Sequence, residues 1–158
     1  MYFWDSIFFT TEGCLRQKPR ASQHMVTLTN ASGIAYKGRD CIISSVQNVM
    51  QAEGLIGRID IILVTDREIK KLHKQWFNDP TVTDVITFPI EPEPPILGEI
   101  YISAETARRQ ASAHNVTLKN ELCRLAVHGA LHLAGYTDKT ISQRTHMQTL
   151  ENTYIACQ

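Results

Sequence analysis

The segment from Leu118 to Ala134 constrains the fold more than any other part of this sequence of 158 residues. It is a long, mostly apolar run, and Gly135 follows it directly. A glycine just beyond a helix readily adopts the left-handed conformation that ends the helix. The pattern predicts a largely buried helix, against which the rest of the domain must pack.

Two histidines, His128 and His132, lie inside this apolar segment. Four residues are about one helical turn, so both imidazoles project from the same face of the helix. A buried imidazole needs a partner to offset the loss of water. A shared metal ion would be such a partner, but two hydrogen-bonded structural histidines would have the same spacing. The spacing alone leaves both interpretations open.

The residues after Gly135 offer a third metal ligand, because a glycine turn lets the chain swing back toward the histidines. The candidates in the returning segment are Thr137, Asp138 and His146. Asp138 is the best placed, as a carboxylate three residues after the turn. Two histidines and one carboxylate suit Zn²⁺ and leave a fourth position for water. These residues would bind one catalytic-type zinc ion through His128, His132 and Asp138, although the pattern by itself still leaves a pair of structural histidines open.

The remaining periodic segments alternate between strands and helices. Strands are expected at 26–28, 59–64, 82–88 and 97–103, and helices at 40–52, 67–76, 103–113, 118–134 and 141–156. Asp66 and Ser103 are the expected caps of two of these helices. The elements follow no strict βαβ rhythm, which indicates an α+β domain with a small mixed β-sheet packed against several helices.

Composition limits the kinds of partner. Lys plus Arg and Asp plus Glu number 16 each, so there is no overall basic field and any nucleic-acid site must be local. The four cysteines form no C-x-x-C pair and are expected to be reduced thiols. We expect residues 1–24 to be an N-terminal extension of doubtful role, with an alternative start at Met25, and 25–158 to be a single domain. The sequence predicts neither a signal peptide nor a membrane span. We therefore expect the protein to lie in the cytoplasm.

A local basic surface is predicted on the helix at 67–76. Apolar residues at helical spacing alternate there with four basic ones: Arg67, Lys70, Lys71 and Lys74. One interpretation is a solvated surface helix, and the other is a face that binds phosphate. Trp76 and Phe77 could stack on bases or belong to the core.

Three blocks in this order resemble the YbeY family, bacterial rRNA maturation factors regarded as zinc-dependent endoribonucleases. They are HGALHLAGY from His128, TDVITFP from Thr83 and LGEI from Leu97. The resemblance covers roughly residues 59 to 151, including Met147 and Glu151 in the last helix.

The resemblance implies a set of metal ligands, with two differences. The family pattern has three histidines, and the third position, ten residues after His128, is Asp138 here. A carboxylate leaves the metal less positive, so its bound water should be somewhat less acidic. The family's arginine six residues before Thr83 aligns with Phe77. Either Lys74 or Lys71 takes over a phosphate contact, or the RNA activity is altered.

The resemblance also implies a function, in which His128 is a catalytic residue of a metal-dependent hydrolase. The substrate would be single-stranded ribosomal RNA, in rRNA maturation and ribosome quality control. The partner would be the small ribosomal subunit or its proteins. Gly129 stands where H-E-x-x-H metallopeptidases carry their glutamate, which argues against peptide hydrolysis. The alternatives are a non-catalytic, zinc-containing ribosome assembly factor and a zinc hydrolase of a non-RNA substrate.

Three charged residues are candidates for supporting roles. Asp84 or Glu99 could orient a ligand histidine through its second ring nitrogen, or could only form strand-end hydrogen bonds. Arg124 lies one turn before His128 on the same face, where it could contact substrate phosphate or a neighbouring helix end.

Overall fold

The computed structural model describes residues 24–91 and 96–156. Its centre is a four-stranded mixed sheet in the order β1-β2-β4-β3. The strands are β1 (His24–Asn30), β2 (Gly57–Val64), β3 (Val85–Glu91) and β4 (Ile96–Ser103). β1, β2 and β4 are parallel, and β3 pairs antiparallel with β4 at the edge. The helices are α1 (Arg39–Glu53), α2 (Asp66–Phe77), α3 (Ala104–Ala113), α4 (Leu118–Leu133) and α5 (Ile141–Tyr154). The predicted α+β class is confirmed.

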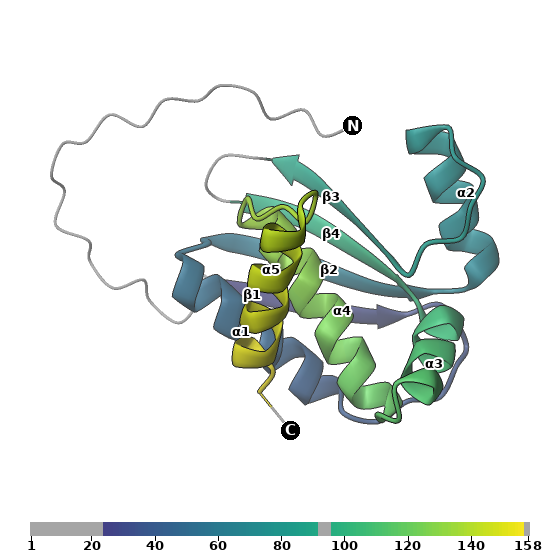
Figure 1. Ribbon diagram of the computed structural model, residues 1–158, viewed down its shortest axis with the longest axis horizontal. Coiled ribbons are helices and arrows are strands. Elements are labelled where there is room, and N and C mark those ends of the chain that lie inside the picture. Colours follow the sequence, from purple (N-terminus) through teal and green to yellow (C-terminus); the bar gives the residue numbers. More distant parts are fainter. Residues whose placement is uncertain (1–23, 92–95, 157–158) are drawn as a thin grey trace, which may run out of the picture.

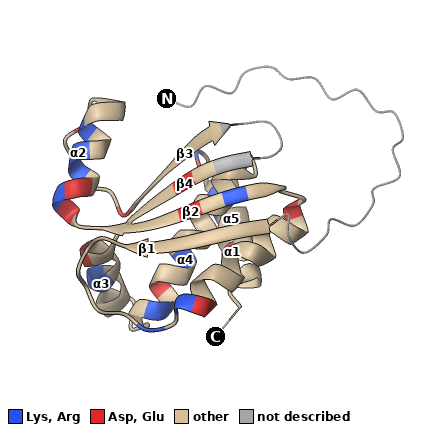
Figure 2. Ribbon diagram, turned by 180° about the vertical axis from the view of Figure 1, so that it is seen from behind, with Lys and Arg blue, Asp and Glu red and all other residues tan. Residues whose placement is uncertain are grey.

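The helices are distributed unequally about the sheet. α1, α4 and α5 cover one face (Figure 1), whereas α2 packs through Ile69 on the opposite face, against Ile86 and Tyr101 near the edge strand β3. Seen from behind, the strands lie in front of these three helices (Figure 2). The main core fills the space between the sheet and α1 and α4, with Ile61 and Ile100 fully buried on the strands and Leu125 and Leu131 on α4. The apolar segment that dominated the sequence is therefore the central helix.

Two glycines let α4 approach the sheet closely. A Cβ on Gly129 would lie 2.6 Å from Cγ2 of Ile100, and a Cβ on Gly98 would lie 2.6 Å from Cδ1 of Leu133. Both positions thus require the absence of a side chain. Because one step along a helix turns the side chain by about 100°, a sheet-facing Gly129 leaves His128 directed to one side of the helix. The packing of α4 on the sheet sets the orientation of the histidine face.

The chain turns back after α4 as the sequence predicts. Ala134 caps the helix, Gly135 has a φ of 92°, and the amide of Tyr136 donates to the carbonyl of Leu131 at 3.0 Å. The following helix, α5, begins at a capping box made by Thr140 and Gln143. This turn brings α5 alongside α4.

Several local predictions need correction. Thr65, not Asp66, caps α2, because its hydroxyl accepts from the amide of Glu68, whose side chain accepts in return from the Thr65 amide. β3 begins at Val85, three residues later than expected, and it includes Pro89 because it is an edge strand. The expected cap of α3, Ser103, is confirmed.

The cysteine prediction is wrong at one position, because Cys41 is disulfide-bonded in the structure. Cys123 is a buried free thiol whose Sγ lies 3.7 Å from that of Cys41. Burial raises the pKa of the Cys123 thiol, so it is held in its unreactive protonated form.

The N-terminal extension, placed at 1–24, lies outside the described residues apart from His24, where β1 begins. Within the described ranges, no helix is both long and apolar enough to cross a membrane.

Candidate metal centre

The structure brings His128, His132 and Asp138 together at the C-terminal end of α4. One ligand-type atom from each lies within 4.8 Å of the other two. Nε2 of His128 is 3.0 Å from Nε2 of His132 and 3.9 Å from Oδ2 of Asp138. The two imidazoles meet edge to face, with ring centroids 4.6 Å apart. The helix supplies two ligand candidates and the turn after Gly135 supplies the third.

Hydrogen bonds at the other ring nitrogens fix the tautomers of both histidines. His132 donates from Nδ1 to the carbonyl of Tyr136 at 2.9 Å, and His128 donates from Nδ1 to the carboxylate of Glu151 at 2.7 Å. A carbonyl and a carboxylate only accept, so the proton of each neutral ring is on Nδ1. Both Nε2 atoms therefore carry a lone pair and no proton, and they lie 3.0 Å apart.

This arrangement fits a bound cation. Two opposed lone pairs at 3.0 Å repel unless a proton or a metal ion lies between them. In a tetrahedral zinc site, two nitrogen ligands are about 3.3 Å apart, close to the observed spacing. Burial and the neighbouring His128 ring lower the pKa of His132 and so favour its neutral form, the form that binds metal. The residues present thus match the requirements of a metal with an open coordination position.

A buried ionic network supports His128. Glu151, which accepts from His128, is 4% exposed and also pairs with Arg124 at 3.5 Å. Arg124 in turn pairs at 2.6 Å with Glu121, which is 2% exposed. Burial alone would lower the pKa of Arg124, but its bonds to Glu121 and the charge of Glu151 raise it, so the guanidinium stays charged. The network holds the His128 ring in one orientation.

Glu151 is the functional residue whose role sequence reasoning missed. It lies on α5, 23 residues from its partner His128. A signal for it exists in the sequence, because Glu151 follows Met147 by four residues and is therefore an acid on the buried face of an amphipathic helix. Buried carboxylates need a partner, so such a residue is a candidate for a site.

The two carboxylates considered for this role have other partners. Asp84 accepts from Nε2 of Gln110 at 3.0 Å and from the amide of Val85 at 2.9 Å. Glu99 accepts from the hydroxyl of Tyr101 at 2.8 Å. Their interpretation as strand-end hydrogen-bonding residues is the one that the geometry supports.

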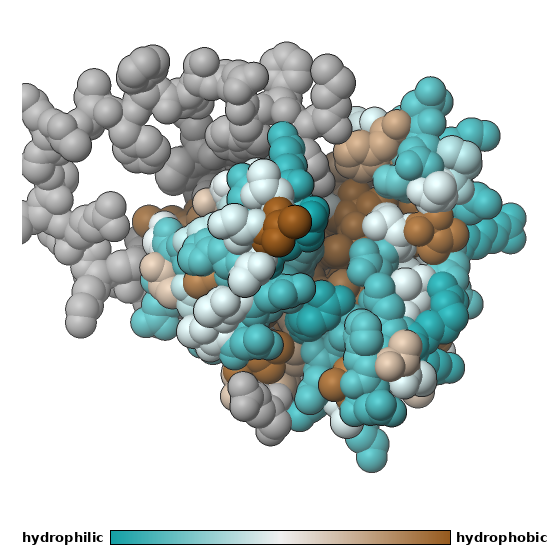
Figure 3. Space-filling model, in the orientation of Figure 1, coloured by the Kyte–Doolittle hydropathy of each residue, from teal (hydrophilic) through white to brown (hydrophobic). Residues whose placement is uncertain are grey.

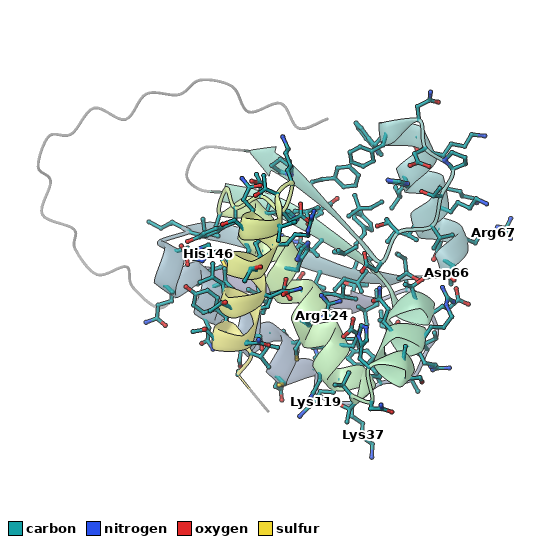
Figure 4. All side chains as sticks on the ribbon, in the orientation of Figure 1. Lys37, Asp66, Arg67, Lys119, Arg124 and His146 are labelled. Carbon is teal, nitrogen blue, oxygen red and sulfur yellow. The ribbon has the colours of Figure 1, made fainter. Side chains whose placement is uncertain are left out.

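A cavity of about 420 Å³ opens beside the three candidate ligands. Its lining includes His128 and Asp138 from the site, and Arg124, Arg144, Gln148 and Asn152 from α4 and α5. Arg124 lies on the part of α4 next to α5, as Figure 4 shows. Arg144 donates to the carbonyls of Asp138 and Lys139 at 3.1 and 3.4 Å, so it fixes the turn that carries the third ligand candidate.

Other predicted residues lie elsewhere. His146, the alternative third ligand, projects from the other side of α5 and contacts the ring of Tyr136 (Figure 4). The stripe of Arg67, Lys70, Lys71 and Lys74 is exposed on α2, and Arg67 points outward from that helix (Figure 4). These four residues are not part of the cavity lining.

The comparisons with known proteins agree with this geometry. The family model described as Endoribonuclease YbeY matches residues 29–157. The chain belongs to the YbeY family.

Individual relatives resemble parts or most of this YbeY-family chain. The endoribonuclease YbeY of Endomicrobium trichonymphae is 38% identical over 100 residues, 63% of this chain and 70% of that protein. The YbeY of Myxococcus xanthus (strain DK1622) is 33% identical over 144 residues, 85% of this chain but 48% of that protein, so the chain spans about half of its length. A Thermotoga maritima protein with a known solution structure is 28% identical, with a TM-score of 0.59 over 83% of this chain and 87% of that chain.

Proposed function

We propose that this protein is a zinc-dependent endoribonuclease that cuts single-stranded ribosomal RNA. The observation that carries the proposal is the pair of opposed Nε2 atoms, 3.0 Å apart, with the Asp138 carboxylate beside them and a cavity in front. Membership of a family whose members are named as endoribonucleases supports RNA as the substrate.

An open metal site supports catalysis over a purely structural role. Structural zinc sites normally have four protein ligands, whereas catalytic sites have three and leave a position for water or substrate. Among the described residues, the group contains three ligand-type side chains. Glu151 is close, but its carboxylate is bound to the Nδ1 side of His128 and faces away from Nε2. A set of three ligands therefore supports a catalytic site over a structural one.

The helix offers no general base of the metallopeptidase kind. In an H-E-x-x-H helix a glutamate follows the first histidine. Here that position is Gly129, where even a Cβ would lie 2.6 Å from Ile100 and 2.9 Å from Oγ1 of Thr87. The packing of α4 on the sheet leaves no room for a glutamate, which supports a phosphodiester over a peptide substrate.

The residues of the cavity have distinct roles in the proposed reaction. A bound zinc ion supplies a Lewis acid that polarises a water molecule or a phosphoryl oxygen. His128 and His132 on a rigid helix, together with Asp138, would hold it. Arg124 already pairs with two buried carboxylates, so it positions Glu151 and, through it, His128. Arg144 is exposed on the cavity wall and is the better placed cation for an RNA phosphate.

The proposed place of this activity in the cell rests on the resemblance to the family and not on the geometry. We propose rRNA maturation, with the small ribosomal subunit or its proteins as partners. One observation favours a second candidate, a zinc-containing assembly factor that does not cut RNA. Phe77 stands where the family pattern has an arginine, and a phenyl ring cannot bind phosphate through charge.

The test is to measure metal content and RNA cleavage in the same preparation of the full chain. We expect about one zinc per chain and cleavage of a single-stranded RNA in preference to its duplex. Chelation should remove both the metal and the cleavage, and added zinc should restore them. Stoichiometric zinc without any cleavage would favour the assembly factor, and a chain without affinity for metal would contradict both candidates.

A further inference from the structure

The apolar stripe of α2 continues past the body of the protein. Ile69 is fully buried in a small second cluster with Val64 and Ile86, and Leu72 is half-buried against it. Trp76 comes one turn later on the same stripe, yet it is 63% exposed. The next residue, Phe77, is 41% exposed. The last turn of α2 therefore presents two large aromatic side chains to solvent.

Ring contacts with Phe88 and His73 hold the side chains of Trp76 and Phe77 in place. Phe88 on β3 contacts both, with ring centroids 5.4 Å from Trp76 and 6.3 Å from Phe77. The rings of Phe77 and Phe88 are close to parallel, at 14°. His73 contacts Phe77 at 5.3 Å and donates from Nδ1 to the carbonyl of Thr81 at 3.1 Å, which ties the loop after α2 to the helix. We call Trp76, Phe77 and Phe88 the aromatic platform.

Positive charge borders the aromatic platform. Lys74 precedes Phe77 by three residues and Lys70 precedes it by seven, so both lie on the Phe77 side of α2. Both are exposed, and Figure 2 shows the basic residues along this helix. The acidic residues of α2, Asp66 and Glu68, lie in its first turn, at the opposite end from the rings. Among the charged residues of α2 itself, only lysines lie near the rings, and Asp79 follows in the loop, where it accepts from the amide of Thr81.

The aromatic platform is placed so that one extended RNA strand could contact it and also reach the metal centre. α2 lies on one side of β3 and β4, and the loop between α4 and α5 lies on the other (Figure 1). A hollow with apolar residues at its base separates these two sides of the surface (Figure 3). An extended chain that crosses the hollow would contact both.

We propose that the aromatic platform stacks on unpaired bases of the RNA, while Lys70 and Lys74 contact the adjacent phosphates; the inference rests on the proposed endoribonuclease function. Exposed rings beside a basic track are the combination by which proteins bind single strands without reading their sequence. Duplex RNA keeps its bases stacked on each other, so the platform selects single strands. Phe77, in place of the arginine of the family pattern, would then bind RNA by stacking on a base instead of by pairing with a phosphate.

The experiment uses the fluorescence of Trp76 in the full chain, with Trp4 replaced by Phe so that one tryptophan remains. Three ligands of equal length are titrated: a single-stranded oligoadenylate, the same chain without bases, and a duplex. We expect the oligoadenylate to quench the fluorescence and the other two to leave it nearly unchanged.

The matched variants are Trp76→Ala, Trp76→Tyr and the control Val116→Ala, another exposed apolar side chain, and their affinities are measured by the fluorescence anisotropy of end-labelled ligands. Trp76→Ala should weaken binding of the oligoadenylate by roughly tenfold and leave binding of the base-free chain unchanged. Trp76→Tyr should restore most of the affinity, and Val116→Ala should have no effect. Zinc content, measured in each variant, should stay constant.

Two results would overturn the inference. One is Trp76→Ala protein that binds the oligoadenylate as tightly as the parent, which would leave the rings as a surface for a protein partner. The other is an equal loss of affinity for the oligoadenylate and the base-free chain, which would make Trp76 a structural residue. Cleavage assayed alongside tests the proposed function separately, because absent cleavage with intact base-dependent quenching counts only against catalysis.

Discussion

The metal centre and the helix α2 are built in opposite ways. At the metal centre, each candidate ligand has a partner that fixes it: Glu151 for His128, the Tyr136 carbonyl for His132, and Arg144 for the backbone of Asp138. On α2, the rings and lysines of the last two turns are exposed, and only Ile69 of the helix is buried. Reaction chemistry needs groups held in one geometry, whereas binding of varied single strands needs an accessible surface. The contrast fits the proposed division, with catalysis at α4 and α5 and RNA recognition on α2.

The largest effect is expected from removing a candidate ligand, as in His132→Ala. The variant lacks the lone pair opposite His128, so stoichiometric zinc and RNA cleavage should both disappear. Elemental analysis and a cleavage assay measure the two results. His146→Ala is the matched control, because this histidine lies outside the ligand group, and it should retain both. An unchanged zinc content in His132→Ala would show that the metal is not bound at this site.

A smaller effect is expected from Glu151→Gln, which changes the partner of a ligand and not a ligand itself. The amide keeps the shape but not the charge that orients His128, so metal affinity should fall by roughly 10- to 100-fold. Competition with a chelator of known affinity measures it. Glu121→Gln is the comparison, since Glu121 is equally buried but reaches His128 only through Arg124 and Glu151, so its loss of metal affinity should be smaller. If both variants bind metal alike, then Glu151 has no special role at the site.

Asp66 attaches the start of α2 to α3, and replacing it should leave the metal centre unchanged. Partial burial alone would raise the pKa of Asp66, but hydrogen bonds from Ser103 and Thr106 and the charge of Arg109 lower it. A lowered pKa means that Asp66 stabilises the fold above the unfolded-state value of about 4, and that this stability is lost as the pH falls through the folded-state pKa.

Asp66→Asn should therefore lower the free energy of unfolding by about 1 to 2 kcal/mol at pH 7, a modest value because Arg109 is largely exposed. The difference from the wild type should shrink as the pH falls below about 4. Urea unfolding at several pH values measures this, with zinc content as the control. A difference that is independent of pH would show that the charge of Asp66 does not contribute.

The smallest effect concerns the lysines of α2. Replacing Lys70 and Lys74 together by Ala should weaken RNA binding and reduce the slope of log affinity against log salt by roughly 0.7 for each phosphate that the variant no longer neutralises. Titrations at several salt concentrations measure the slope. An unchanged slope would mean that this helix is a solvated surface and that recognition lies elsewhere.

The candidate ligand group and the basic face of α2 could be predicted from the sequence, because both depend on residues that are close together in the chain. The helical spacing of His128 and His132 and the turn at Gly135 were enough to bring in Asp138, because all three lie within eleven residues. The helix α2 and its basic face also follow from periodicity. The cap of α2, which is Thr65, and the start of β3 at Val85 were predicted wrongly by one and three residues. The ends of helices and strands are set by the hydrogen bonds of caps and sheet edges, which the periodicity of apolar residues does not reveal.

What could not be predicted depends on contacts between distant segments. Glu151 reaches His128 only because α5 folds back on α4, and the true partners of Asp84 and Glu99 depend on strand pairing and on α3. The exposure of Trp76 is similar, since its place on the apolar stripe is equally compatible with a core residue. Its surface position depends on where α2 leaves the sheet edge.

The central claim is that Asp138 completes a catalytic metal site with the two histidines. The most direct measurement compares zinc content and RNA cleavage in Asp138→Ala, Asp138→His and, as a control, Asp40→Ala, which removes an exposed carboxylate on α1. We predict that Asp138→Ala loses both zinc and cleavage, that Asp138→His regains zinc through a third imidazole, and that Asp40→Ala resembles the wild type. Asp138→Ala protein that keeps one zinc per chain and cuts RNA at the wild-type rate would contradict the account.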